Sequence, residues 1–125
     1  MTVLFYTKQN DLAAEQLQSV IELLVLKDQL EMCRTFDSLS RTLCRPSNKL
    51  DIAVLAAANG KDLLKILSLR DLLSDIRIIL ILPDRKPDTI SKAHSLGPRF
   101  LTYLDSNVEE LQSVLSKMLD NATYP

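Results

Sequence analysis

The sequence predicts an α/β fold in which helices cover both faces of a single parallel sheet. Short apolar runs alternate with amphipathic stretches along the whole of the 125 residues. The run at residues 52–57 is apolar at every position, which is typical of a central strand buried on both faces. No linker or low-complexity tract interrupts the alternation. Right-handed crossovers then favour one doubly wound domain with five strands in the order 2-1-3-4-5.

The first half of the chain predicts three strands and two helices. The strands are expected at residues 3–6, 30–33 and 52–57, because each is a short, largely apolar run. A helix is expected from residue 11 and another over 36–44, which Pro46-Ser47-Asn48 should end. The first helix carries its apolar residues on one stripe, made of Ala13, Ala14, Leu17, Val20, Ile21 and Leu24.

The second half predicts two further strands and three helices. A helix should open at residues 60–61, and residues 68–75 should form a separate turn after it. Strands are expected at 76–82 and 100–104, with a helix over 88–96 that Pro87 starts and Gly97 stops. Ser106-Asn107-Val108-Glu109 resembles a capping box at the start of the last helix. Residues 1–120 should form the domain, and 121–125 a disordered tail.

Charge and hydropathy exclude several functional classes. Fifteen basic and sixteen acidic residues give a net charge of −1, and no basic cluster favours nucleic acid or an anionic membrane surface. Apolar runs such as 78–82 are far shorter than the roughly 20 residues that span a bilayer. The start of the sequence lacks a secretory signal, so a cytoplasmic location is expected.

The two cysteines give no sign of a metal or redox site. Cys33 and Cys44 lack CxxC spacing and a companion histidine cluster. Two reduced, packed thiols are expected, with a redox pair or a shared metal as the alternative. No cofactor or metal is predicted.

In a doubly wound sheet the functional crevice lies at the carboxyl ends of the strands, where the strand order reverses. The crevice is therefore expected between the first and third strands, next to the ends of the fourth and fifth. The residues at these strand ends are Thr7, Lys8, 56–59, Leu82, Pro83, Asp84 and Tyr103.

In order and spacing of elements the chain resembles the receiver domains of bacterial two-component response regulators, whose fold is flavodoxin-like (CheY-like). The resemblance covers nearly all 125 residues. It is clearest at 51–55, at 76–82, and at 93–102 with Gly97 and Phe100-Leu101-Thr102. These are motifs of the scaffold rather than of the phosphorylation site.

The resemblance also implies that the phosphorylation chemistry of receivers is missing. Their Mg²⁺-binding acidic pair falls on Thr7 and Lys8, and their phosphoacceptor aspartate falls on Ala56. Their switch Ser or Thr, which closes the fourth strand, falls on Leu82, and the fifth-strand lysine that pairs with the phosphoryl group falls on Tyr103. A methyl group is no nucleophile and an ammonium repels Mg²⁺, so phosphoryl transfer by the usual route is not expected. The resemblance thus favours a pseudo-receiver that acts by protein–protein interaction.

Receivers make regulatory contacts through their fourth helix, fifth strand and fifth helix. The matching surface would include Ile90, His94, Thr102, Tyr103 and Val114. Tyr103 is either an aromatic residue packed at the sheet edge or a ring that contacts a partner. His94 has no second ligand at metal-binding spacing, so a surface imidazole is expected. The implied partner is a histidine kinase, a regulator or a second copy.

Three leucines of the first helical region lie off its core stripe. Leu12, Leu23 and Leu26 are expected to face solvent, and they are candidates for a homodimer contact. Isolated exposed leucines are also common in monomers.

Two other functional classes remain open at this point. A small-ligand or nucleotide-binding flavodoxin-like protein could use Thr7, Lys8, Asn59 and Asp84 as polar anchors, although the loop at 6–11 lacks the glycines of a phosphate cradle. An enzyme is the third class. No Ser-His-Asp set surrounds His94, and Lys8 with Asp84 is the one candidate catalytic pair.

Overall fold

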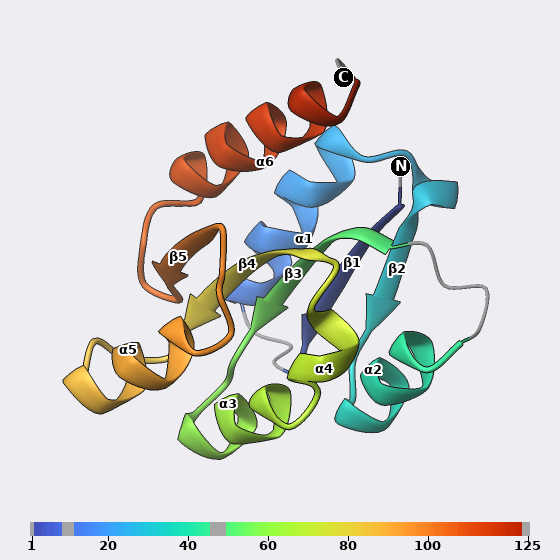
Figure 1. Cartoon of the computed structure of the whole chain (residues 1–125). Coiled ribbons are helices and arrows are strands. Elements are labelled where there is room, and N and C mark those ends of the chain that lie inside the picture. The colour runs from blue at the N-terminus through green and yellow to red at the C-terminus, as the bar shows by residue number, and fades with distance from the viewer. Residues whose placement is uncertain (1, 9–11, 46–49, 124–125) are drawn as a thin grey trace.

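A five-stranded parallel sheet forms the centre of the molecule (Figure 1). The structure is a computed structural model that describes residues 2–8, 12–45 and 50–123. The strands lie in the order β2-β1-β3-β4-β5, as predicted, and all neighbours are parallel. They are β1 (Thr2–Thr7), β2 (Leu30–Cys33), β3 (Leu50–Ala56), β4 (Arg77–Leu82) and β5 (Phe100–Tyr103).

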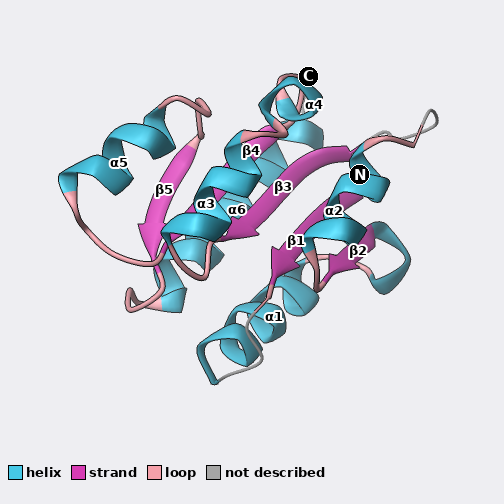
Figure 2. Ribbon diagram, turned by 90° about the horizontal axis from the view of Figure 1, so that it is seen from below, coloured by secondary structure: helices cyan, strands magenta, loops and turns pink. Residues whose placement is uncertain are grey.

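Helices cover both faces of this sheet (Figures 1 and 2). One face carries the first and last α-helices, and the other face carries the four α-helices between them. In chain order the helices are α1 (Leu12–Leu24), the 3-10 helix η1 (Lys27–Gln29), α2 (Phe36–Leu43), α3 (Gly60–Leu67), α4 (Arg70–Leu73), α5 (Pro87–His94) and α6 (Val108–Thr123).

Side chains of the central strands alternate between two cores. On β3, Val54 points toward α1 and α6, whereas Leu55 points toward α2, α3, α4 and α5. Every residue from Ile52 to Ala57 and from Ile78 to Leu82 is buried. Burial on both faces explains why these two runs are continuously apolar rather than alternating.

Helix boundaries agree with the local sequence signals in most places. Gly97 has a φ of 69°, the left-handed conformation that suits a glycine beyond a helix end. Residues 68–75 contain the short helix α4, in agreement with the expected separate turn. The expected helix stop at 46–48 and the residues at 124–125 lie outside the part of the chain that the structure describes.

Three local predictions were wrong. Asn107, and not Ser106, caps the start of α6, because its Oδ1 accepts a hydrogen bond of 2.9 Å from the Glu109 amide. The helix α6 continues to Thr123, past the expected end at 120, so the tail prediction fails for its first three residues. Cys33 is buried as expected, but Cys44 is exposed because it follows the last turn of α2.

Candidate functional site

The residues predicted for the phosphorylation pocket do meet at the carboxyl edge of the sheet. Thr7 of β1 is the direct register partner of Ala56 of β3. Ala56 in turn pairs with Ile81 of β4, and the next residue, Leu82, pairs with Tyr103 of β5. The topology therefore brings together residues that are far apart in sequence, as the strand order predicts.

Three of the five residues at this edge lie in the core. Thr7, Ala56 and Leu82 are all buried. Lys8 is exposed and Tyr103 is half-buried, so these two reach the surface. A methyl group at residue 56, packed between a threonine and an isoleucine, supplies neither a nucleophile nor a ligand for a cation.

The main polar feature of the edge is Asp62, which is not among the predicted site residues. Its carboxylate is 2% exposed, although it lies on α3 only three residues beyond the N-cap Asn59. The Tyr6 hydroxyl donates to Asp62 Oδ1 at 2.7 Å, and the Ala58 amide donates to Oδ2 at 2.9 Å. Lys8 Nζ lies 3.9 Å from Oδ1. Asp62 therefore joins β1, the loop after β3 and the start of α3.

A sequence signal for Asp62 was present. Asn59 and Asp62 stand at N-cap and N3, and Asn59 Oδ1 accepts a hydrogen bond of 2.8 Å from the Asp62 amide. The N-cap and N3 side chains of a capping box satisfy amides that the first helical turn leaves unpaired. Here the N3 carboxylate reaches one residue further back, to Ala58. The positive end of the α3 dipole also favours a carboxylate at this position.

The environment of Tyr6 indicates a structural role for the pair. Burial raises the pKa of the Tyr6 hydroxyl far above its usual value, and the hydrogen bond to Asp62 raises it further. The phenol therefore stays protonated and donates to the carboxylate. The buried Asp62 carboxylate accepts hydrogen bonds from Tyr6 and Ala58 and lies near the Lys8 ammonium. It is therefore not available to attack a phosphoryl group.

A second polar cluster joins the loops that follow β4 and β5. Arg85 Nη1 donates to Asp105 Oδ2 at 2.7 Å, and the guanidinium lies 4.2 Å from the centroid of the Tyr103 ring. The hydrogen bond from Arg85 lowers the pKa of the Asp105 carboxyl. The Arg85 guanidinium thus packs over the Tyr103 ring, which lies on the side of the sheet covered by α5.

The polar anchors expected for a small ligand are already engaged. Asn59 caps α3, and Lys8 lies beside Asp62. Asp84 Oδ1 accepts a hydrogen bond of 3.0 Å from the Lys86 amide. That bond, with a smaller contribution from Thr89, lowers the pKa of the Asp84 carboxyl. These contacts do not favour the ligand-binding class or the catalytic use of Lys8 with Asp84.

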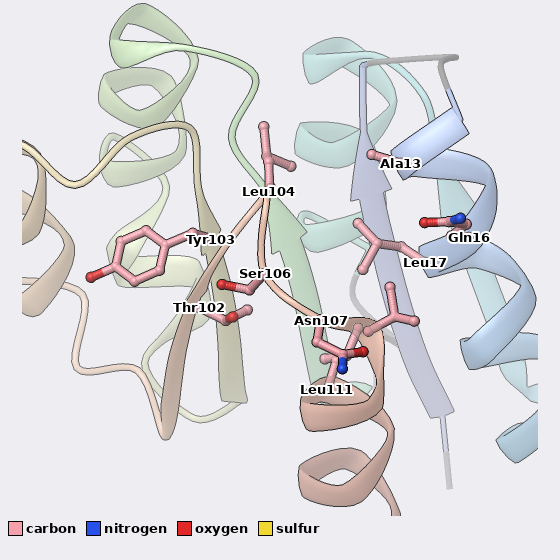
Figure 3. A pocket seen from close by; sticks show the side chains of 10 residues that line it. Ala13, Gln16, Leu17, Thr102, Tyr103, Leu104, Ser106, Asn107 and Leu111 are labelled. Carbon is pink, nitrogen blue, oxygen red and sulfur yellow. The ribbon is translucent and has the colours of Figure 1, made fainter.

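A small pocket lies between α1, the end of β5 and the start of α6 (Figure 3). Its volume is about 20 Å³, which suits roughly one water molecule. Leu17 and Leu111 lie on one side of it, and the Tyr103 ring points away from them (Figure 3). Among the residues that the structure describes, no group of three His, Cys, Asp or Glu side chains is placed to hold a metal.

The predicted partner surface at α5, β5 and α6 is formed only in part. His94 is exposed, and Ile90, Tyr103 and Val114 are half-buried. Thr102 is only 5% exposed, so its inclusion was wrong: its side chain alternates with that of Tyr103 and points to the opposite face of the sheet. Leu12, Leu23 and Leu26 are exposed, as predicted.

No described helix is both long enough and apolar enough to cross a membrane.

Comparison with known proteins places the fold. No protein-family model and no curated protein sequence matches this chain. A CheY-like receiver domain protein from Methanospirillum hungatei JF-1 is 9% identical with a TM-score of 0.73, over 97% of this chain and 95% of that chain. The signal receiver domain of a DNA-binding response regulator from Colwellia psychrerythraea 34H is 13% identical with a TM-score of 0.74, over 96% and 99%.

A third similar structure is a response regulator from Burkholderia pseudomallei with a phosphorylated aspartic acid, a calcium ion and citrate. It is 17% identical with a TM-score of 0.67, over 100% of this chain and 76% of that chain. At these identities the similarity establishes a shared fold: the chain has the CheY-like, flavodoxin-like fold of response-regulator receiver domains.

Proposed function

We propose that this chain, which has the fold of receiver domains, is a pseudo-receiver that transmits signals by binding a protein and is not phosphorylated. The observation that carries the proposal is the composition of the carboxyl edge. Ala56 occupies the position of the phosphoacceptor, and Thr7 and Lys8 replace the acidic pair. The fold is kept while the groups needed for phosphoryl transfer are lost.

Two aspartates near this edge do not replace the missing nucleophile. Asp62 is buried under two hydrogen bonds. Asp84 accepts a hydrogen bond from the Lys86 amide two residues ahead, and so shapes the turn that leads into α5. Lys8 adds a positive charge where a receiver would bind Mg²⁺. The three observations together support a domain without a phosphorylated state.

Beryllofluoride with Mg²⁺, which mimics an aspartyl phosphate, is expected to leave the protein unchanged. The measurement is a titration followed by amide chemical shifts, with attention to Thr7, Lys8, Ala57 and Tyr103. A receiver domain that retains its phosphoacceptor serves as the positive control. Saturable, Mg²⁺-dependent shifts at these amides would refute the proposal.

The α5–β5–α6 surface is the proposed contact for the protein partner, with Ile90, His94, Tyr103 and Val114 as its accessible residues. Tyr103→Ala is expected to reduce recovery of the partner from the source lysate by roughly tenfold, because aromatic residues often dominate binding energy. Recovery is measured by quantitative mass spectrometry on immobilised protein.

Asp71→Ala, an exposed substitution on α4 and outside this surface, is the matched control for this experiment. Its recovery should equal that of the wild type. Equal recovery with Tyr103→Ala would show that this surface is not the contact.

A further inference from the structure

The loop between β4 and α5 holds Arg85 in a closed turn. The Asp84 side chain accepts a hydrogen bond of 3.0 Å from the Lys86 amide, so residues 84–86 form a turn with Arg85 at its centre. The Lys86 carbonyl accepts a hydrogen bond of 3.0 Å from the Ile90 amide, which joins this turn to the first turn of α5. The backbone at Arg85 is therefore anchored at α5, and its side chain starts from a defined position.

A second turn follows β5 and presents Asp105. The Ser106 amide donates to the Tyr103 carbonyl at 3.0 Å, and the Leu104 amide donates to the last carbonyl of β4 at 2.9 Å. The second bond extends the pairing of β4 with β5, so the loops that follow the two strands leave the sheet side by side. Arg85 and Asp105 therefore meet, although they are 20 residues apart in the sequence.

Tyr103 contacts both the core and the first of these turns. Its side chain packs against the hydrophobic cluster on the α5 side of the sheet, as does Ile90. The Arg85 guanidinium lies 4.2 Å from the ring centroid, and its Nη1 donates to Asp105 Oδ2 at 2.7 Å. The half-buried ring points away from the pocket beside α1 (Figure 3). One arginine thus contacts both the ring and the carboxylate.

These contacts favour one orientation of the Tyr103 side chain. A half-buried tyrosine at the end of a strand has more than one staggered rotamer open to it. A cation over the ring favours the stacked rotamer, by about twofold to fivefold at an exposed site. The charge-assisted hydrogen bond to Asp105 fixes the guanidinium in the position from which it stacks. The two contacts therefore support each other.

No other ion pair among the described residues competes for this arginine. Arg85 and Asp105 pair only with each other. Nearby on α5, Lys92 Nζ lies 2.9 Å from Asp88 Oδ2, so these two charges satisfy one another. Lys86, next to Arg85, is exposed and takes part in none of the ion pairs. It offers a matched control, because its removal takes the same charge from the same loop.

We propose that Arg85 and Asp105 are positioning residues for the partner contact, and that their ion pair holds the Tyr103 ring in one orientation on the α5–β5–α6 surface. The inference rests on the proposed function, because it takes Tyr103 as the residue that contacts the partner. A ring that is fixed before binding loses less conformational freedom when the partner docks. The surface is therefore ready to bind without a preceding change of shape.

The orientation of the ring is measured on the free protein by NMR, so this measurement needs no partner. The χ1 couplings of wild-type Tyr103 should report one rotamer, whereas Arg85→Gln should give averaged couplings and Asp105→Asn an intermediate result. Lys86→Gln should keep the single rotamer. High salt should move the wild type toward Arg85→Gln, because salt screens an exposed ion pair. An unchanged Tyr103 rotamer in Arg85→Gln would overturn the inference.

Recovery of the partner then relates the orientation of the ring to binding. Arg85→Gln should reduce recovery by about threefold, less than the effect of Tyr103→Ala, and Lys86→Gln should match the wild type. If Tyr103→Ala reduces recovery but Arg85→Gln does not, the positioning role is wrong and the proposed function stands. If neither variant reduces recovery, the proposed contact surface is wrong as well. Circular dichroism confirms that each variant is folded.

A double-mutant cycle separates positioning from direct contact with the partner. If Arg85 acts through the ring, Arg85→Gln should cause no further loss of recovery once Tyr103 is replaced by alanine. A further loss of about threefold in the Tyr103→Ala background would show that Arg85 contacts the partner directly, and the positioning role would be wrong.

Discussion

Asp62→Ala is expected to lower the free energy of unfolding by about 2–4 kcal/mol, because it leaves buried donors without an acceptor. The Tyr6 hydroxyl and the Ala58 amide both donate to this carboxylate at hydrogen-bond distance. Neither donor gains another protein partner when the side chain is shortened to a methyl group. The start of α3 also loses a negative charge that its dipole favours. Urea unfolding followed by circular dichroism measures the change.

Three further substitutions distinguish the loss of these hydrogen bonds from a general sensitivity of α3 to substitution. Tyr6→Phe removes one donor and should cost less, about 1–2 kcal/mol. Asp71→Ala, on an exposed position of α4, should stay within about 0.5 kcal/mol of the wild type. A double-mutant cycle between Tyr6→Phe and Asp62→Asn should give a clear coupling energy. Additive effects, or an Asp62→Ala protein as stable as the wild type, would contradict the account.

Ala56→Asp is expected to destabilise the protein by several kcal/mol without restoring phosphorylation, because it buries a charge. Residue 56 lies in the core, between Thr7 and Ile81, and has no cation beside it in the sheet register. Acetyl phosphate with Mg²⁺ should add no mass to the variant in intact mass spectrometry. A phosphorylated product would show that the missing carboxylate is the only defect of this edge.

Ala56→Asn separates the charge from the added volume. Burial raises the pKa of a carboxyl group, so an aspartate at residue 56 is easiest to bury when protonated. Relative to Ala56→Asn, the deficit of Ala56→Asp should be complete above the raised pKa of the folded state. It should disappear as the pH falls below about 4, where the carboxyl is protonated in both states. A deficit that does not change with pH would point to volume instead of charge.

The fold could be predicted because its signals are local and repeated. The apolar runs at β3 and β4, and the helical stripe of α1, each follow from periodicity alone. Right-handed crossovers then place helices on both faces of the sheet, and 2-1-3-4-5 is a common strand order for five strands in such a fold. The position of Ala56 beside Thr7 was predictable for the same reason, since register and topology place both at one edge.

The polar contacts of the edge could not be predicted in the same way. Tyr6 lies in an apolar run, where a tyrosine resembles a core aromatic, and its acceptor is 56 residues further along the chain. In the sequence, Asp62 resembles a solvent-exposed residue of a first helical turn. In the structure it is buried, because β1 lies beside the loop that follows β3, and the local sequence does not indicate this arrangement. The burial of Thr102 depends on which way β5 faces, a choice that four weakly patterned residues leave open.

The two outer strands of the sheet have a consequence for how copies of this protein can meet. β2 and β5 form the edges, and each contains only four residues. Short edge strands offer little backbone for an additional strand from another molecule, which is one way that proteins avoid sheet-to-sheet aggregation. A contact between two copies would therefore involve side chains on the helical layers, where the exposed leucines of this molecule lie.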